Sequence, residues 1–198
     1  MRVIVTGGAG FIGQALTREL AQAGHEVVVL DALTYAANPA TAVELETLGG
    51  VRLARLDVCD GAGVAALLDE VRPDAIAHLA AETHVDRSID GPAAFVRTNV
   101  VGTQTLLHAA LDHWRGLDGA AREAFRFVHV STDEVFGSLG PEGRFSTETP
   151  YDPRSPYSAS KAASDHMARA YGHTYGLPVI VTNCSINYGP YQFPEKLI

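Results

Sequence analysis

The 198-residue chain has a globular composition, with 46% hydrophobic and 19% charged residues, and it is long enough to bury a sizeable core. A net charge of −8 without a basic run excludes nucleic acid and anionic lipid as general partners. The histidines and cysteines lack metal-ligand spacing, so we expect no metal site. Cys59 and Cys184 are predicted to be reduced thiols of a cytoplasmic protein. The first apolar run is too short for a signal peptide, and no stretch is long enough to span a membrane.

Short, continuous apolar runs alternate with helix-length segments along the chain. The runs, predicted as buried strands, are residues 3–5, 27–30, 51–56, 75–79, 127–130 and 179–181. Residues 12–23, 63–71, 92–114 and 156–175 are predicted as helices, and residues 116–123 and 137–154 as loops. This alternation predicts an α/β Rossmann fold, a doubly wound parallel sheet with helices on both faces.

A glycine-rich turn follows the first predicted strand and opens the first predicted helix. Gly7, Gly10 and Gly13 let the backbone turn tightly, so that a pyrophosphate can meet the N–H groups of the helix. Asp31 ends the second strand 18 residues after Gly13, where a carboxylate binds ribose hydroxyls and repels a 2′-phosphate. We therefore predict an NAD-binding domain over residues 1–185. Further residues expected to contact the cofactor are Phe11, Ile12, Asp57, Val58, Leu79, Ala80, Ala81 and Asn99.

Tyr157 and Lys161 lie four residues apart at the start of a predicted helix, so both face the same side. A nearby ammonium favours the phenolate and lowers the pKa of the tyrosine, which could then take a proton from a hydroxyl. A tyrosine and a lysine at this spacing usually lie on a solvated helix face without a catalytic role. Its position after the glycine loop and after Ser131 and Thr132 favours catalysis.

Two adjacent carboxylates, Asp133 and Glu134, follow the fifth strand, at the edge where open α/β sheets place their active sites. Two acids in one cleft can hold different protonation states, so that one donates a proton and the other accepts one. Elimination of water requires one group that donates a proton and another that accepts one. The simpler alternative is a helix cap followed by a solvated acid.

These features together resemble the extended short-chain dehydrogenase/reductase family over essentially the whole chain. Within it, residues 31–36, 81–89, 131–137 and 182–198 resemble the dTDP-glucose 4,6-dehydratases. The resemblance implies a redox-neutral lyase that converts dTDP-glucose to dTDP-4-keto-6-deoxyglucose. It also implies a homodimer, formed by the helices at 92–114 and 156–175.

The resemblance also implies a role for each catalytic residue. Tyr157 would remove the O4 proton while a hydride passes from C4 to NAD, with Lys161 binding the nicotinamide ribose and Thr132 bonded to O4. Glu134 would take the C5 proton, Asp133 would protonate the departing C6 hydroxyl, and the hydride would return to C6. The resemblance adds Leu33, Thr34 and Thr83 to the cofactor contacts, and gives as substrate contacts Thr83, Thr132, Asn187, Lys196 and Leu197.

The chain departs from this family at two points. Ile186 stands where an asparagine is usual, and the chain ends at Ile198, where family members continue. We expect residues 186–198 to begin a substrate-binding region whose remainder is absent, so the chain alone should turn over poorly. The alternatives are another NAD-dependent nucleotide-sugar dehydratase, a 4-epimerase or decarboxylase, and a non-catalytic NAD-binding module.

Overall fold

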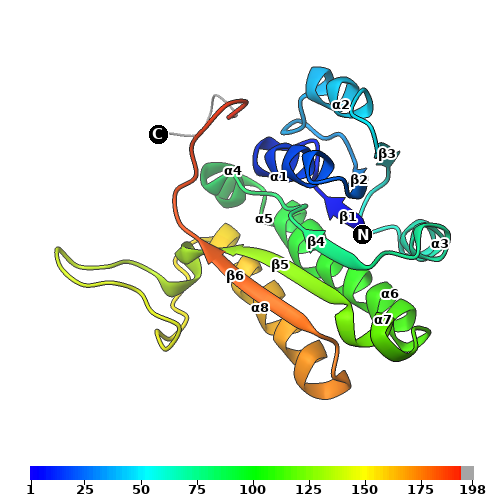
Figure 1. Cartoon of the computed structure of the whole chain (residues 1–198). Coiled ribbons are helices and arrows are strands. Elements are labelled where there is room, and N and C mark those ends of the chain that lie inside the picture. Colours follow the sequence, from blue (N-terminus) through cyan, green and yellow to red (C-terminus); the bar gives the residue numbers. More distant parts are fainter. Residues whose placement is uncertain (193–198) are drawn as a thin grey trace.

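A computed structural model describes residues 1–192 of the chain. Six parallel strands form one sheet in the order β3-β2-β1-β4-β5-β6 (Figure 1). The strands are β1 (Arg2–Thr6), β2 (Glu26–Asp31), β3 (Val51–Arg55), β4 (Ala75–His78), β5 (Arg126–Thr132) and β6 (Val179–Cys184). Each predicted apolar run is therefore a strand, and the doubly wound fold is confirmed.

Helices cover both faces of the sheet, because successive side chains of a buried strand point to opposite faces. Ile4, Ile76 and Phe127 pack in one core against α3 (Gly61–Val71), α6 (Thr103–Arg115) and α8 (Pro156–Tyr175). Val5 and Val29 belong to a second core, with α1 (Phe11–Gln22) and α2 (Pro39–Glu46).

The helix expected at 92–114 is a continuous helical run with a widened middle. It comprises α5 (Pro92–Phe95), the π-helical segment η1 (Val96–Gly102) and α6. A Cβ on Gly102 would lie 2.7 Å from Cγ2 of Val58, so the glycine lets this helix approach the segment after β3. π-Helical turns are often found at functional sites.

Several short helices were not predicted: α2, α4 (Val85–Asp90), α7 (Gly119–Ala124) and the 3₁₀ turn η2 (Asp133–Phe136). The prediction of a loop over 116–123 was therefore wrong from residue 119 onward, where α7 begins. Residues 137–155 form an irregular segment that projects from the body of the molecule (Figure 1).

The order of the strands places a crevice at the carboxyl ends of β1 and β4. Successive connections leave these neighbouring strands toward opposite faces, so the loops part there, and open α/β sheets bind ligands at that point. None of the helices within residues 1–192 is long and apolar enough to cross a membrane.

Candidate active site

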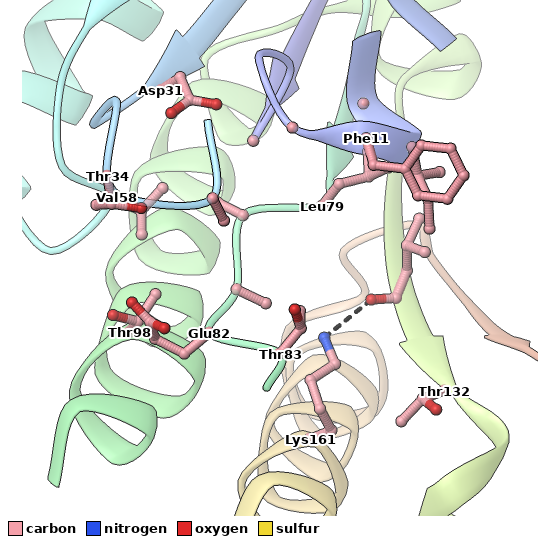
Figure 2. A pocket seen from close by; sticks show the side chains of 18 of the residues that line it. Phe11, Asp31, Thr34, Val58, Leu79, Glu82, Thr83, Thr98, Thr132 and Lys161 are labelled. Carbon is pink, nitrogen blue, oxygen red and sulfur yellow. Dashed lines mark hydrogen bonds between the residues drawn. The ribbon is translucent and has the colours of Figure 1, made fainter. Parts of the chain in front are cut away.

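A cleft of about 470 Å³ opens at the carboxyl ends of β1, β2, β4 and β5. Figure 2 shows Asp31, Thr34 and Val58 at one end of it and Thr132 and Lys161 at the other. The glycine loop and the start of α1 line the middle, so the cleft joins the predicted cofactor residues to the predicted catalytic residues.

The glycine loop is pressed against the backbone around it. A Cβ on Gly13 would lie 2.1 Å from the carbonyl oxygen of Gly7, and a Cβ on Gly7 would lie 2.7 Å from the amide nitrogen of Ala80. Gly7 also has a φ of 67°, which other residues rarely adopt. Among residues 1–192 no side chain caps the N-terminus of α1 at Gly10, so the first N–H groups of the helix are available to an anion in the cleft.

Asp31 lines the cleft at the end of β2. Its carboxylate accepts hydrogen bonds from the backbone N–H groups of Ala9 at 3.0 Å and Leu33 at 2.8 Å. Burial raises the pKa of Asp31, and these two bonds oppose that shift. The carboxylate thereby ties the glycine loop to the turn after β2, with its oxygens at the cleft wall.

Lys161 lies on α8 with its ammonium in the protein interior. Its Nζ donates a hydrogen bond to the carbonyl oxygen of Val130 at 2.9 Å, drawn as a dashed line in Figure 2. Burial lowers the pKa of Lys161 to about 8, while the charge of Asp165 acts in the opposite direction. The ammonium is therefore mostly charged at pH 7 and lines the cleft.

Tyr157 also lines the cleft, one turn before Lys161, and packs edge-on against Phe95 with ring centroids 6.3 Å apart. Burial raises the pKa of Tyr157, the charge of Glu134 raises it further, and the Thr132 side chain acts in the opposite direction. The expectation that Lys161 lowers this pKa is not met by the chain's own groups: the net shift is upward, and the Lys161 ammonium donates to the Val130 carbonyl.

The acid pair lies on η2, directly after β5. Thr132 caps this turn, its Oγ1 accepting a hydrogen bond from the Glu134 N–H at 3.2 Å. Thr132 and Glu134 line the cleft; Asp133 does not, and its carboxylate accepts a 3.4 Å bond from the Thr132 hydroxyl. A 3₁₀ turn has three residues per turn, so adjacent side chains diverge by about 120°.

Two predicted cofactor residues, Asn99 and Leu33, lie outside the cleft wall. The buried Asn99 amide is fully occupied by the backbone N–H and C=O of Glu82, at 2.8 and 2.9 Å, and by Ser160 Oγ at 2.8 Å. It holds the segment after β4 against α8 instead. Leu33 adopts a φ of 53° in the turn after β2, and its backbone N–H donates to the Asp31 carboxylate.

The other predicted cofactor residues line the cleft: Gly7, Gly10, Phe11, Ile12, Gly13, Asp31, Thr34, Asp57, Val58, Leu79, Ala80, Ala81 and Thr83. Lining residues that were not predicted include Glu82, Thr98 and Cys184. Both Glu82 and Thr98 are adjacent in sequence to predicted cofactor residues, and that adjacency was the available signal for them. Cys184 gave none, because a lone cysteine is usually structural.

The last predicted substrate contacts lie at the end of the described chain. Asn187 lines the cleft, and its amide donates to the Ser185 carbonyl at 2.9 Å. Ile186, which departs from the family pattern, lines the cleft and is 78% exposed. Lys196 and Leu197 lie outside the described residues.

Comparison with known proteins supports the resemblance. The chain is 60% identical to the dTDP-glucose 4,6-dehydratase of Xanthomonas campestris pv. campestris strain B100, over 98% of this chain and 56% of the relative. It is 51% identical to dTDP-glucose 4,6-dehydratase 1 of Escherichia coli K12, covering 58% of that protein. The chain thus spans a little over half the length of these curated relatives.

Solved structures give the same result. DesIV, a dTDP-glucose 4,6-dehydratase of Streptomyces venezuelae crystallised with NAD and TYD bound, is 50% identical with a TM-score of 0.89, over 100% of this chain and 60% of that one. A Thermus thermophilus UDP-glucose 4-epimerase in complex with NAD is 34% identical with a TM-score of 0.86, over 98% and 58%. The family described as GDP-mannose 4,6 dehydratase matches residues 4–198, and the chain belongs to that family.

Proposed function

We propose that this chain carries the cofactor site and the catalytic groups of an NAD-dependent dTDP-glucose 4,6-dehydratase. One observation carries the proposal: Glu134 on its turn, and Tyr157 with Lys161 on α8, line the cleft that the glycine loop also lines. The names of the similar proteins support the same activity.

The shape of the cleft fits NAD. Side chains at Gly7 or Gly13 would collide with backbone, and the uncapped start of α1 offers N–H groups to a pyrophosphate. Asp31 lines the cleft at the end of β2, where its carboxylate would bind the hydroxyls of a ribose. Held there, NAD would supply the hydride acceptor for oxidation at sugar C4 and, once reduced, the hydride donor for C6.

The chain's own residues handle the protons of the first step. Tyr157 accepts the O4 proton, and the Thr132 hydroxyl binds O4. Because burial holds the pKa of Tyr157 high, the phenolate needs a positive charge beside it. Lys161, largely charged below its pKa of about 8, would bind the nicotinamide ribose, and its charge together with that of a bound nicotinamide would favour the phenolate.

Loss of water follows once C4 is a ketone, because the ketone acidifies the hydrogen on C5. Glu134 takes the C5 proton and Asp133 gives a proton to the C6 hydroxyl, which leaves as water. Glu134 returns its proton to C5 when the hydride is delivered to C6. The divergence of the two side chains on η2 suits groups that act at neighbouring carbons. Asp133 is joined to the cleft wall through the Thr132 hydroxyl.

The assembly and the rest of the site belong to the same proposal. Val96 and Val101 on η1 are 52% and 47% exposed, which supports a homodimer through the 92–115 helices and α8. Residues 186–198 begin the substrate-binding region, following the NAD-binding domain at 1–185. The free thiols of Cys59 and Cys184 support a cytoplasmic location.

The test is an assay of the longest polypeptide that the source gene encodes, here called the gene product. Incubated with NAD and dTDP-glucose, it should form a 4-keto-6-deoxy sugar that alkali reveals by absorbance. Absence of that product would refute the proposal. A gene product that binds NAD but neither binds nor converts dTDP-glucose would be a non-catalytic NAD-binding module.

A further inference from the structure

Asp165 is a buried carboxylate that the proposed chemistry does not use. It lies on α8 one turn after Lys161, and its side chain is fully buried. An uncompensated charge in such a place is costly, so its partners account for its retention.

Its two oxygens accept hydrogen bonds from four residues in three segments of the chain. Oδ2 accepts hydrogen bonds from the Ser131 hydroxyl at 2.9 Å, the Tyr151 hydroxyl at 2.8 Å and the Asn183 amide at 3.4 Å. Oδ1 accepts from Nε2 of His129 at 3.0 Å. Because all four partners donate, the ionised carboxylate, which only accepts, satisfies them without a competing donor. Burial raises the pKa of Asp165, but the hydrogen bonds from His129, Ser131 and Tyr151, with the charge of His129, together hold it below its usual value.

The donors from the sheet lead to the catalytic turn. Ser131 and Asn183 are at the carboxyl ends of β5 and β6, and the Asn183 amide also donates to the Thr132 carbonyl at 3.1 Å. The position of Thr132, the cap of η2, therefore depends on two groups that Asp165 holds.

Tyr151, the donor from the irregular segment, and its neighbour Asp152 contact the other end of η2. The Tyr151 ring packs against Phe136 with centroids 5.2 Å apart, and the N–H of Asp152 donates to the Val135 carbonyl at 2.9 Å. Arg169 donates to the Tyr151 hydroxyl at 2.9 Å. Asp165 thus anchors η2 from both sides onto α8, which carries Tyr157 and Lys161.

We propose that Asp165 is a positioning residue that holds the Thr132–Glu134 turn in register with Tyr157 and Lys161. The inference rests on the proposed function, because it assigns the turn and the pair to one reaction. An apolar residue of similar volume would fill the same space at lower cost in solvation. What the carboxylate adds is a fixed relation between β5, β6 and α8 at the cleft.

The test compares four variants of the gene product: Asp165→Asn, Tyr151→Phe, the double variant and Ser164→Ala. Asparagine keeps the shape of Asp165 but has one acceptor oxygen, so the donors cannot all be satisfied. Ser164 is the matched control, because its hydroxyl also contacts His129 but reaches neither strand end.

We expect Asp165→Asn to lower kcat by about 100-fold with KM and NAD affinity changed by less than about threefold. Tyr151→Phe, at a half-buried site, should lower kcat by about threefold to tenfold. The double variant should have a kcat within about twofold of that of Asp165→Asn. Ser164→Ala should stay within about twofold of the parent.

Hydrogen exchange supplies a measure that does not need turnover. The amides of Gly137 and Asp152, bonded to the turn, should exchange about tenfold faster in Asp165→Asn, with those of β1–β3 unchanged. If the parent does not convert dTDP-glucose, the proposed function fails and this comparison still decides the role of Asp165. Unchanged exchange and kcat in both single variants, or an equal loss of kcat, NAD affinity and thermal stability, would overturn the proposal.

Discussion

Replacing Lys161 with methionine should stabilise the fold while abolishing its chemistry. The fully buried lysine has a pKa of about 8 instead of its ordinary 10.5. At about 1.4 kcal/mol per pKa unit, holding the charged form in the fold costs about 3 kcal/mol. Methionine avoids this cost but loses the hydrogen bond to Val130, which contributes about 1 kcal/mol. The net gain expected at pH 7 is about 2 kcal/mol.

The pH dependence follows from the direction of the shift. Below pH 8 both the folded and the unfolded chain hold the proton, so the full penalty applies to the parent. Between about 8 and 10.5 the folded lysine releases its proton while the unfolded one retains it, so the parent gains stability as the pH rises. The advantage of Lys161→Met should therefore shrink to near zero by about pH 9.5.

The assay is urea unfolding of parent and variant at pH 7 and pH 9.5, with Ser164→Ala as a control whose stability difference from the parent should not vary with pH. Turnover of dTDP-glucose by Lys161→Met should fall by at least about 100-fold. A variant that is less stable than the parent at pH 7, or a stability difference that is the same at both pH values, would refute the reasoning.

Two further substitutions test the two ends of the cleft. Gly13→Ala adds a Cβ only 2.1 Å from the Gly7 carbonyl oxygen, so the loop must shift. NAD binding should weaken by about 100-fold or more in a calorimetric titration. Affinity within about threefold of the parent would show that the loop does not cradle the pyrophosphate. Glu134→Gln should stop the reaction after the first hydride transfer, so that NADH-like absorbance accumulates on adding dTDP-glucose; continued turnover would favour a 4-epimerase.

The sheet and the two ends of the cleft could be predicted because their signals are local. Each strand is a continuous apolar run, and the glycine loop lies directly between a strand and a helix. Tyr157 and Lys161 are one helical turn apart, so a regular helix necessarily places them on one face. The short helices were harder: α2 begins with Asn38 as its cap and Pro39 in its first turn, but its 8 residues lack a clear apolar stripe.

The site was hardest to predict where neighbouring residues in the sequence face different directions. Asn99 lies in a π-helical stretch, where the usual helical phase does not apply, and it points to Glu82 and Ser160 while Thr98 lines the cleft. Asp133 and Glu134 diverge on a 3₁₀ turn. Asp165 had no local signal at all, because its partners Tyr151, Asn183 and Ser131 are 14, 18 and 34 residues away.

The central claim is that the cofactor in this cleft stores one hydride and returns it to the same sugar. The direct test is to incubate the gene product with dTDP-glucose carrying deuterium at C4, without added NADH, and to locate the label in the product. We predict a 4-keto-6-deoxy sugar with the deuterium at C6. A product whose C6 carries only hydrogen, or deuterium found in free NADH, would contradict the account.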